Sequence, residues 1–195
     1  MLKVAVTGNI ASGKSLVQKY IEKSGIHCID ADDICRDLLA NDKDIITSVQ
    51  EAFKDFDITE NGNISRKKLS DIIFQNSKQK KLLEGIIHPK VKEEIDSFIK
   101  NEKHNGLVIV FIPLLFETGM DKMFDKIIFI SAGQEIRLKR LERRNALSRD
   151  AALRIISSQR REEEKIPYCH FVLHNNSAPE DLYAQIDVIL PKLLN

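Results

Sequence analysis

The stretch Gly8-Asn9-Ile10-Ala11-Ser12-Gly13-Lys14-Ser15 constrains this chain more than any other feature. It follows a short apolar run at residues 2–6 and leads into a segment in which apolar residues recur at helical spacing. Between a strand and a helix, glycines allow the backbone to curl so that successive N–H groups point at phosphate oxygens. The pattern therefore predicts a phosphate-binding loop, with Lys14 reaching the β- and γ-phosphates of a nucleotide and Ser15 placed to coordinate Mg²⁺.

Apolar runs elsewhere in the chain predict further strands, at residues 26–29, 107–112, 126–130 and 170–173. A strand, a glycine loop, a helix and a second strand begin a βαβ arrangement, which gives a parallel sheet covered by helices. The unbroken run at 107–112 predicts an interior strand buried on both faces. A final helix from Pro179 repeats apolar residues on one face, namely Leu182, Ile186, Ile189, Leu190 and Leu193. We expect an α/β fold of the P-loop NTPase type, with three α/β/α layers around a five-stranded parallel sheet.

Two charged helical segments interrupt this pattern of strands. Residues 31–103 predict a helical insertion with a turn at 59–63 and a helix boundary at His88-Pro89, because the residue before a proline avoids helical geometry. Residues 134–167 are rich in arginine and predict two helices that meet near 145–148. We expect a core domain formed by 1–30, 104–133 and 168–195, a helical substrate-binding subdomain at 31–103 and a helical lid at 134–167.

The composition argues against several classes of protein. The 30 basic and 29 acidic side chains give a net charge of +1, whereas a general nucleic-acid binder is usually more basic. No apolar run reaches the ~18 residues of a membrane span, and the N-terminus does not read as a signal peptide. Cys28, Cys35 and Cys169 lie far apart, which argues against a disulfide framework and fits a reducing compartment. We expect a cytoplasmic protein that binds neither nucleic acid nor membranes and acts as a monomer, with weak self-association left open.

Two carboxylates follow the second expected strand, in Ile29-Asp30-Ala31-Asp32. Ligands of an open parallel sheet bind beyond the carboxyl ends of its strands, so we expect Asp30 and Asp32 beside the phosphate-binding loop. A carboxylate there can orient a hydroxyl and accept its proton during phosphoryl transfer, and Asp32 is the better candidate. The residues alone equally allow either aspartate to cap the helix that runs from Asp33.

Absent motifs narrow the class of nucleotide-binding protein. The chain has neither the Asp-x-x-Gly nor the Asn-Lys-x-Asp sequence that a GTPase requires, and its central strand does not end in Walker-B acids. A short chain with a helical insertion and an arginine-rich lid is typical of small-molecule kinases. A nucleoside or nucleoside-monophosphate kinase stays open as one alternative. A non-enzymatic ATP-binding protein is another, although it leaves Asp32 and the lid arginines without a role.

Several strings elsewhere in the chain are more specific than the phosphate-binding loop. They are Ile29-Asp30-Ala31-Asp32, Asn61-Gly62-Asn63-Ile64-Ser65-Arg66 with Leu69 and Phe74, His88-Pro89, Pro113-Leu114-Leu115-Phe116-Glu117, and then Gln134, Arg137, Leu138, Arg140, Gln159 and Asn175. Together with the loop, they make the chain resemble the dephospho-CoA kinase family along nearly its whole length. The resemblance implies transfer of the γ-phosphate of ATP to the ribose 3′-hydroxyl of dephospho-CoA, which gives coenzyme A and ADP in the last step of coenzyme A biosynthesis.

The same resemblance implies roles for particular residues. Asp32 would be the catalytic base, with Lys14 and Arg140 acting on the transferred phosphate, while Arg137 and Arg144 are weaker candidates that could simply be solvated. ATP binding is assigned to Gly8, Asn9, Ile10, Ala11, Ser12, Gly13, Lys14, Ser15, Arg140 and Asn175, although Asn175 could also only form a turn. Acceptor binding is assigned to Asp32, Arg66, His88, Pro89, Leu115 and Glu117. Mg²⁺ would be the cofactor, bound through Ser15.

Three positions depart from the pattern of the family, which often has glycine at Asn9 and Ala11 and threonine at Leu16. We expect the loop to keep its function, with Ala11 at negative φ.

Two further patterns predict no site. Residues 57–64 resemble a calcium-binding loop, but Lys68 stands where such a loop needs a glutamate, so we predict a turn before a helix capped by Ser65. The run Glu162-Glu163-Glu164 beside Lys165 reads as a solvated helix face.

Overall fold

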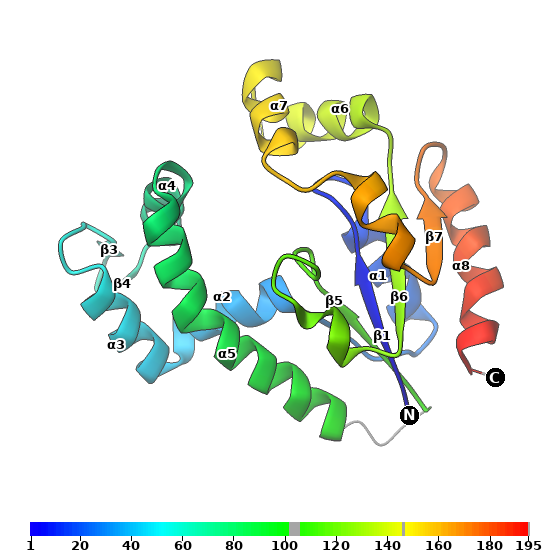
Figure 1. Ribbon diagram of the computed structural model, residues 1–195, viewed down its shortest axis with the longest axis horizontal. Coiled ribbons are helices and arrows are strands. Elements are labelled where there is room, and N and C mark those ends of the chain that lie inside the picture. The colour runs from blue at the N-terminus through cyan, green and yellow to red at the C-terminus, as the bar shows by residue number, and fades with distance from the viewer. Residues whose placement is uncertain (102–105, 146, 195) are drawn as a thin grey trace. The chain divides into compact units, whose positions relative to one another are not determined.

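The computed structural model describes the backbone of residues 1–101, 106–145 and 147–194 (Figure 1). The chain divides into two compact units. Residues Met1–Asp30 and Ile99–Asn195 form the core unit, and Ala31–Phe98 form the helical unit. The boundary expected between residues 103 and 104 lies outside the described residues.

The core unit is built on a five-stranded sheet in which every pair of neighbours is parallel, in the order β2-β5-β1-β6-β7. The strands are β1 (Leu2–Thr7), β2 (Cys28–Asp30), β5 (Leu107–Phe111), β6 (Lys126–Ser131) and β7 (Phe171–His174). All residues of β5 are buried, as the unbroken apolar run predicts for an interior strand. The expected sheet is therefore confirmed, with strand ends displaced by one or two residues.

Helices α1 (Lys14–Lys23) and α8 (Pro179–Leu194) flank the sheet (Figure 1). They share one apolar cluster with side chains from the strands, in which Val17 and Ile21 of α1 meet the stripe of α8. All five residues of the predicted α8 stripe are buried. Tyr20 and Tyr183 stack with ring centroids 4.1 Å apart and join the two helices. The amphipathic periods seen in the sequence thus build this side of the core.

The arginine-rich segment forms two helices, α6 (Gln134–Asn145) and α7 (Arg149–Ser157), as expected. Ser148 caps α7, and its side chain accepts a hydrogen bond from the backbone N–H of Ala151 at 3.3 Å. A second apolar cluster holds α6 and α7 together and reaches the phosphate-binding loop. Its buried members are Leu138, Leu141, Ala152 and Ile156, and its partly buried members are Ile10, Ala11, Leu147 and Leu153.

The acidic run is helical and mostly solvated, as predicted: Glu163 and Glu164 are exposed and Glu162 is half-buried. The chain forms two short 3₁₀ turns at Glu162–Glu164 and Ile166–Tyr168, and a third, η1, at Met120–Met123. Lys165, between the first two turns, is only 1% exposed. Its partners within the core unit, described below, explain why this one lysine is buried while the neighbouring Glu163 and Glu164 face water.

The helical unit contains α2 (Ala31–Asn41), α3 (Lys43–Ala52), α4 (Arg66–Gln75) and α5 (Ser77–Asn101), the last of which ends in the core unit. A hairpin of β3 (Thr59–Glu60) and β4 (Asn63–Ile64) takes the place of the expected turn. Asn61 and Gly62 both have positive φ, which suits a tight hairpin turn. The Lys68 ammonium lies 2.7 Å from an Asp57 carboxylate oxygen, so a lysine charge already neutralises this acid.

His88-Pro89 is not a helix boundary, because α5 continues through Pro89. Proline removes one backbone hydrogen bond and usually breaks or kinks a helix. Here, side chains one turn apart along α5 are all buried, namely Leu83, Ile87, Val91, Ile95 and Ile99. The burial of this stripe outweighs the local preference of the proline.

Candidate active site

Two positions of the phosphate-binding loop have no room for a side chain and therefore require glycine. A Cβ atom on Gly8 would lie 2.5 Å from the carbonyl oxygen of Ile130. Gly13 has a φ of +109°, and a Cβ there would lie 2.1 Å from the Asn175 amide nitrogen. Gly13 directly precedes α1, so the curled loop delivers its backbone N–H groups at the positive end of that helix.

Ala11 adopts a φ of +60°, so the expectation of a negative φ is wrong. Left-handed backbone costs a non-glycine residue about 1–2 kcal/mol, which the surrounding structure must offset. The alanine is partly buried in the cluster that joins the loop to α6 and α7. Asn9 is not among the residues of positive φ and is held by its side chain instead.

The catalytic candidates of the loop stand at the start of α1. The Lys14 ammonium donates to the Gly8 carbonyl at 2.6 Å and lies 3.4 Å from the Asn9 carbonyl. Ser15 is exposed in the first turn of α1, so its hydroxyl is open to a ligand. Within the described part of the chain, no group of three or more histidine, cysteine, aspartate or glutamate side chains could hold a metal ion. Because Mg²⁺ in kinase sites takes few protein ligands and completes its shell with phosphates and water, Ser15 fits it as a partner.

Arg140 of α6 reaches the loop, as expected. Its guanidinium donates to the carbonyl oxygens of Ala11 at 3.2 Å and Ser12 at 3.3 Å, and to the backbone and side-chain oxygens of Asn175 at 3.1 Å. Asn175 is buried and donates to the Ser12 carbonyl at 2.7 Å. Burial lowers the pKa of Arg140 from its usual value, but an arginine stays charged at neutral pH. A positive charge is thus held beside the loop.

Arg137 is not a solvated arginine. It is 6% exposed, its Nε donates to the Ala132 carbonyl at 3.0 Å, and it lies 3.6 Å from Glu162. Glu162 also accepts a hydrogen bond from the Ser131 hydroxyl at 2.6 Å. Arg137 lines a cleft of about 510 Å³ in the core unit with residues of β6, α6 and the segment 156–163. The side chain of Arg144 lies outside the described residues.

A second set of contacts on the phosphate-binding loop was not predicted from the sequence. The Lys165 ammonium lies 3.0 Å from the side-chain oxygen of Asn9 and 2.6 Å from Glu117. The Ile10 N–H donates to the side-chain oxygen of Gln159 at 2.7 Å. The one available signal was a lysine placed next to a run of acids, and the periodicity of that run suggested only a solvated surface.

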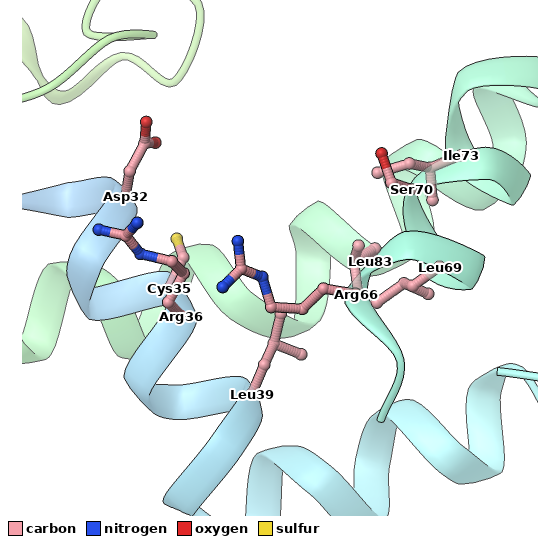
Figure 2. A pocket seen from close by; sticks show the side chains of 9 residues that line it. All are labelled: Asp32, Cys35, Arg36, Leu39, Arg66, Leu69, Ser70, Ile73 and Leu83. Atoms are coloured by element: carbon pink, nitrogen blue, oxygen red, sulfur yellow. The ribbon is translucent and has the colours of Figure 1, made fainter. Parts of the chain in front are cut away.

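The helical unit has its own pocket, of about 300 Å³ (Figure 2). Its lining residues are Asp32, Cys35, Arg36 and Leu39 of α2, Arg66, Leu69, Ser70 and Ile73 of α4, and Leu83 of α5. Figure 2 shows the Arg66 side chain reaching from α4 toward α2, which carries Arg36 and Asp32, with Leu69 and Leu83 on the opposite side of the pocket from Asp32. Arg36 also forms an ion pair with Asp33. The pocket therefore combines two positive charges, one carboxylate and apolar side chains.

The remaining acceptor-side candidates are placed differently. His88 and Pro89 belong to α5 and are not among the lining residues of this pocket. Burial, the largest cause, lowers the pKa of His88 from its usual value. Leu115 and Glu117 belong to the core unit, where Leu115 is fully buried and Glu117 pairs with Lys165.

A glycine loop at the start of the first helix of a parallel sheet, contacted by an arginine from α6, defines the class of P-loop kinases of small molecules. Sequence comparison then gives the particular family. Residues 2–181 match the family described as dephospho-CoA kinase. A dephospho-CoA kinase from Fusobacterium nucleatum is 39% identical over 184 residues, which cover 94% of each chain. The chain therefore belongs to the dephospho-CoA kinase family.

Solved structures agree with this assignment. A crystal structure of a Thermus thermophilus protein matches with a TM-score of 0.84 and 29% identity, covering 98% of this chain and 97% of the other. A dephospho-CoA kinase from Campylobacter jejuni matches with a TM-score of 0.73, also at 29% identity, covering 98% and 96% of the two chains. The chain is thus an ATP-dependent kinase with the architecture of this family.

Proposed function

We propose that this chain transfers the γ-phosphate of ATP to the 3′-hydroxyl of the ribose in dephospho-CoA, producing coenzyme A and ADP. The observation that carries the proposal is the match to the dephospho-CoA kinase family over residues 2–181. The loop closed by Arg140 supplies the physical basis for the phosphoryl donor side of the reaction. In the transfer, the hydroxyl oxygen forms a bond to the γ-phosphorus, the bond to the β-phosphate oxygen breaks, and the hydroxyl proton leaves.

On the donor side, residues Gly8 to Ser15 bind the phosphates through backbone N–H groups. Lys14 moves from the Gly8 carbonyl to the β- and γ-phosphates, where its charge stabilises the transition state. Arg140 already faces the loop and neutralises charge that develops on the transferred group. Asn175 fixes Arg140 and the start of α1, so its part in nucleotide binding is exerted through these contacts. The Ser15 hydroxyl would hold Mg²⁺, which would supply positive charge to the phosphates.

On the acceptor side, Asp32 orients the hydroxyl and accepts its proton. Asp32 follows the last residue of β2 by two positions and also lines the pocket of the helical unit. Arg66 and Arg36 in that pocket suit the diphosphate of dephospho-CoA, and the apolar lining suits its pantetheine arm. His88 and Pro89 belong to α5, Leu115 packs inside the core unit and Glu117 pairs with Lys165, so we assign none of the four a direct contact with the acceptor.

The setting of the reaction is also a proposal. We assign the chain to the cytoplasm, acting as a monomer on small molecules and without nucleic acid. In the described portion of the chain, no helix is long and apolar enough to cross a membrane. The cysteines Cys28, Cys35 and Cys169 are thiols and not disulfides, which fits a reducing compartment.

A direct test is to measure ADP formation by the purified protein with ATP, Mg²⁺ and one acceptor at a time, using dephospho-CoA, AMP, CMP and adenosine. We expect turnover with dephospho-CoA and a product that carries a new 3′-phosphate by mass spectrometry. Turnover with a nucleoside or a nucleoside monophosphate, together with none on dephospho-CoA, would replace the proposal with the alternative kinase. ATP binding without turnover on any acceptor would indicate a non-enzymatic protein.

A further inference from the structure

Lys165 is a buried cation that links three separate segments of the core unit. Its side chain is 1% exposed, and its ammonium lies 2.6 Å from Glu117 and 3.0 Å from the side-chain oxygen of Asn9. Asn9 belongs to the phosphate-binding loop, Glu117 follows β5, and Lys165 follows the lid helices. A buried ammonium requires partners of this kind, because an uncompensated charge in the interior is very costly.

The same segment holds the loop at two further points. The side-chain nitrogen of Asn9 donates to the Arg160 carbonyl at 3.2 Å, so both polar atoms of this amide are engaged. The next backbone N–H, that of Ile10, donates to the side-chain oxygen of Gln159 at 2.7 Å. The first turn of the loop is therefore fixed from outside by residues 159–165, whereas Gly8 and Gly13 only allow it to form.

These contacts reach the reacting phosphate through Lys14. Its ammonium donates to the Gly8 carbonyl at 2.6 Å and lies 3.4 Å from the Asn9 carbonyl. The Asn9 side chain thus anchors the residue whose carbonyl helps define where Lys14 rests. A displacement of Asn9 would shift the Lys14 ammonium, which contacts the γ-phosphate during transfer. Small misplacements of a catalytic group reduce rates strongly.

We propose that Lys165 is a positioning residue for phosphoryl transfer. Paired with Glu117, it fixes Asn9, and through Asn9 it sets the position of Lys14 relative to the terminal phosphate of ATP. This inference rests on the proposed function and deepens it, since it assigns Glu117 to Lys165 instead of to the acceptor.

The first test uses Asn9→Leu and Glu117→Gln, which remove the two partners of Lys165 from different segments. We expect each variant to lower kcat about 10- to 100-fold. The KM for dephospho-CoA and the Kd for ADP should each change less than about threefold, because the acceptor pocket and the late part of the loop are untouched. Glu180→Gln is the matched control, since Glu180 is exposed at the start of α8 in the same unit, and its kcat should equal that of the parent. A parent-like kcat in folded Asn9→Leu and Glu117→Gln would overturn the proposal.

The double variant Asn9→Leu/Glu117→Gln tests whether both residues act through Lys165. If they do, the loss in kcat of the double variant equals that of the more affected single variant, because the effects of coupled residues are not additive. Independent losses that multiply would overturn the proposed link. Lys165→Met should show the same loss, and Lys165→Arg should recover part of it. If Lys165→Met fails to fold, the comparison of the Asn9→Leu and Glu117→Gln single variants with their double variant tests the proposed link without it.

A measurement without acceptor separates this inference from the proposed function. We would measure the Kd of ADP and of a non-hydrolysable ATP analogue by calorimetry for the parent and the two single variants. The preference for the triphosphate should fall about tenfold in the variants, because Lys14 reaches the terminal phosphate. If dephospho-CoA is not phosphorylated but this preference falls, the proposed function fails and the positioning role stands. An unchanged preference would overturn the positioning role whatever the acceptor is.

Discussion

The two units of the chain differ in how deeply their polar side chains are buried. In the core unit, Thr7, Asn9, Ser12, Arg137, Lys165 and Asn175 are all buried. In the described part of the helical unit, only Ser65 is a buried polar residue, and it donates to Glu60 of the hairpin. The charged residues that line the helical pocket, Asp32, Arg36 and Arg66, are exposed on helix surfaces.

This difference indicates how each unit prepares its part of the reaction. Buried, hydrogen-bonded groups keep a fixed geometry, which suits the stabilisation of charge on a transferred phosphate. Exposed side chains on helices can adjust their rotamers, which suits the binding of a long acceptor. We therefore expect substitutions in the core unit to lower the rate by displacing neighbouring groups. We expect substitutions in the helical unit to remove only the function of the side chain that is replaced.

The largest effect is expected from Asp32→Asn in the helical unit. Loss of a general base should lower kcat by ~10²–10⁴-fold while the Kd for ATP stays nearly unchanged. Steady-state kinetics and calorimetry on the same preparation measure both quantities. Asp37→Asn, an exposed aspartate on the same helix that accepts a hydrogen bond from Asn41, is the control. Undiminished turnover in Asp32→Asn would remove the catalytic role and leave Asp32 as an acidic residue that favours the first turn of α2.

The corresponding change in the core unit is Arg140→Ala, which should lower kcat by ~10²–10³-fold. Arg140→Lys should not restore activity, because lysine lacks the planar fork that contacts both the loop and Asn175. Arg143→Ala, an exposed arginine on the same helix, controls for loss of charge. Equal losses in the two alanine variants would show that only the net charge of the lid matters.

A smaller effect on stability is expected from Ala11→Gly. The substitution removes the left-handed strain of an alanine at a φ of +60°, but it adds freedom to the unfolded chain and removes a methyl group from the lid cluster. We expect a net stabilisation of about 0.5 kcal/mol, measured by thermal unfolding. Ala184→Gly, in the exposed middle of α8, should instead destabilise by about 1 kcal/mol. A lower melting temperature for Ala11→Gly would mean that packing of the methyl group outweighs the strain.

The smallest effect concerns the pH dependence of the helical unit. Burial lowers the pKa of His88, so the folded state resists protonation that the unfolded state accepts. As the pH falls from about 7.5 to about 5.5, the unfolded state binds the extra proton and stability decreases. Amide hydrogen exchange in α5 should therefore quicken over this range, after correction for the intrinsic rate. His88→Gln should remove this dependence, and its persistence in that variant would assign it to another group.

The strands, the loop and the last helix could be predicted from the sequence because each follows from a local pattern. The α8 stripe is a clear example, since every predicted residue is buried. Three features that local patterns did not predict have a common cause, which is that contacts distant in sequence outweighed local preferences. Pro89 is kept helical by the buried stripe of α5, Ala11 is held at positive φ inside the loop, and Lys165 is buried by Asn9 and Glu117.

The rings of Phe116 and Tyr168, near the Lys165–Glu117 ion pair in sequence, offer a position for a fluorescent probe. The chain contains no tryptophan, and Tyr168 is 63% exposed, with its ring centroid 6.2 Å from that of Phe116. Phe116 directly precedes Glu117, and Tyr168 lies three residues after Lys165. Tyr168→Trp would therefore place the only tryptophan of the chain against Phe116, close in sequence to both members of this ion pair. Its emission could follow in real time, without a label, whether the pair stays closed while a nucleotide enters and leaves.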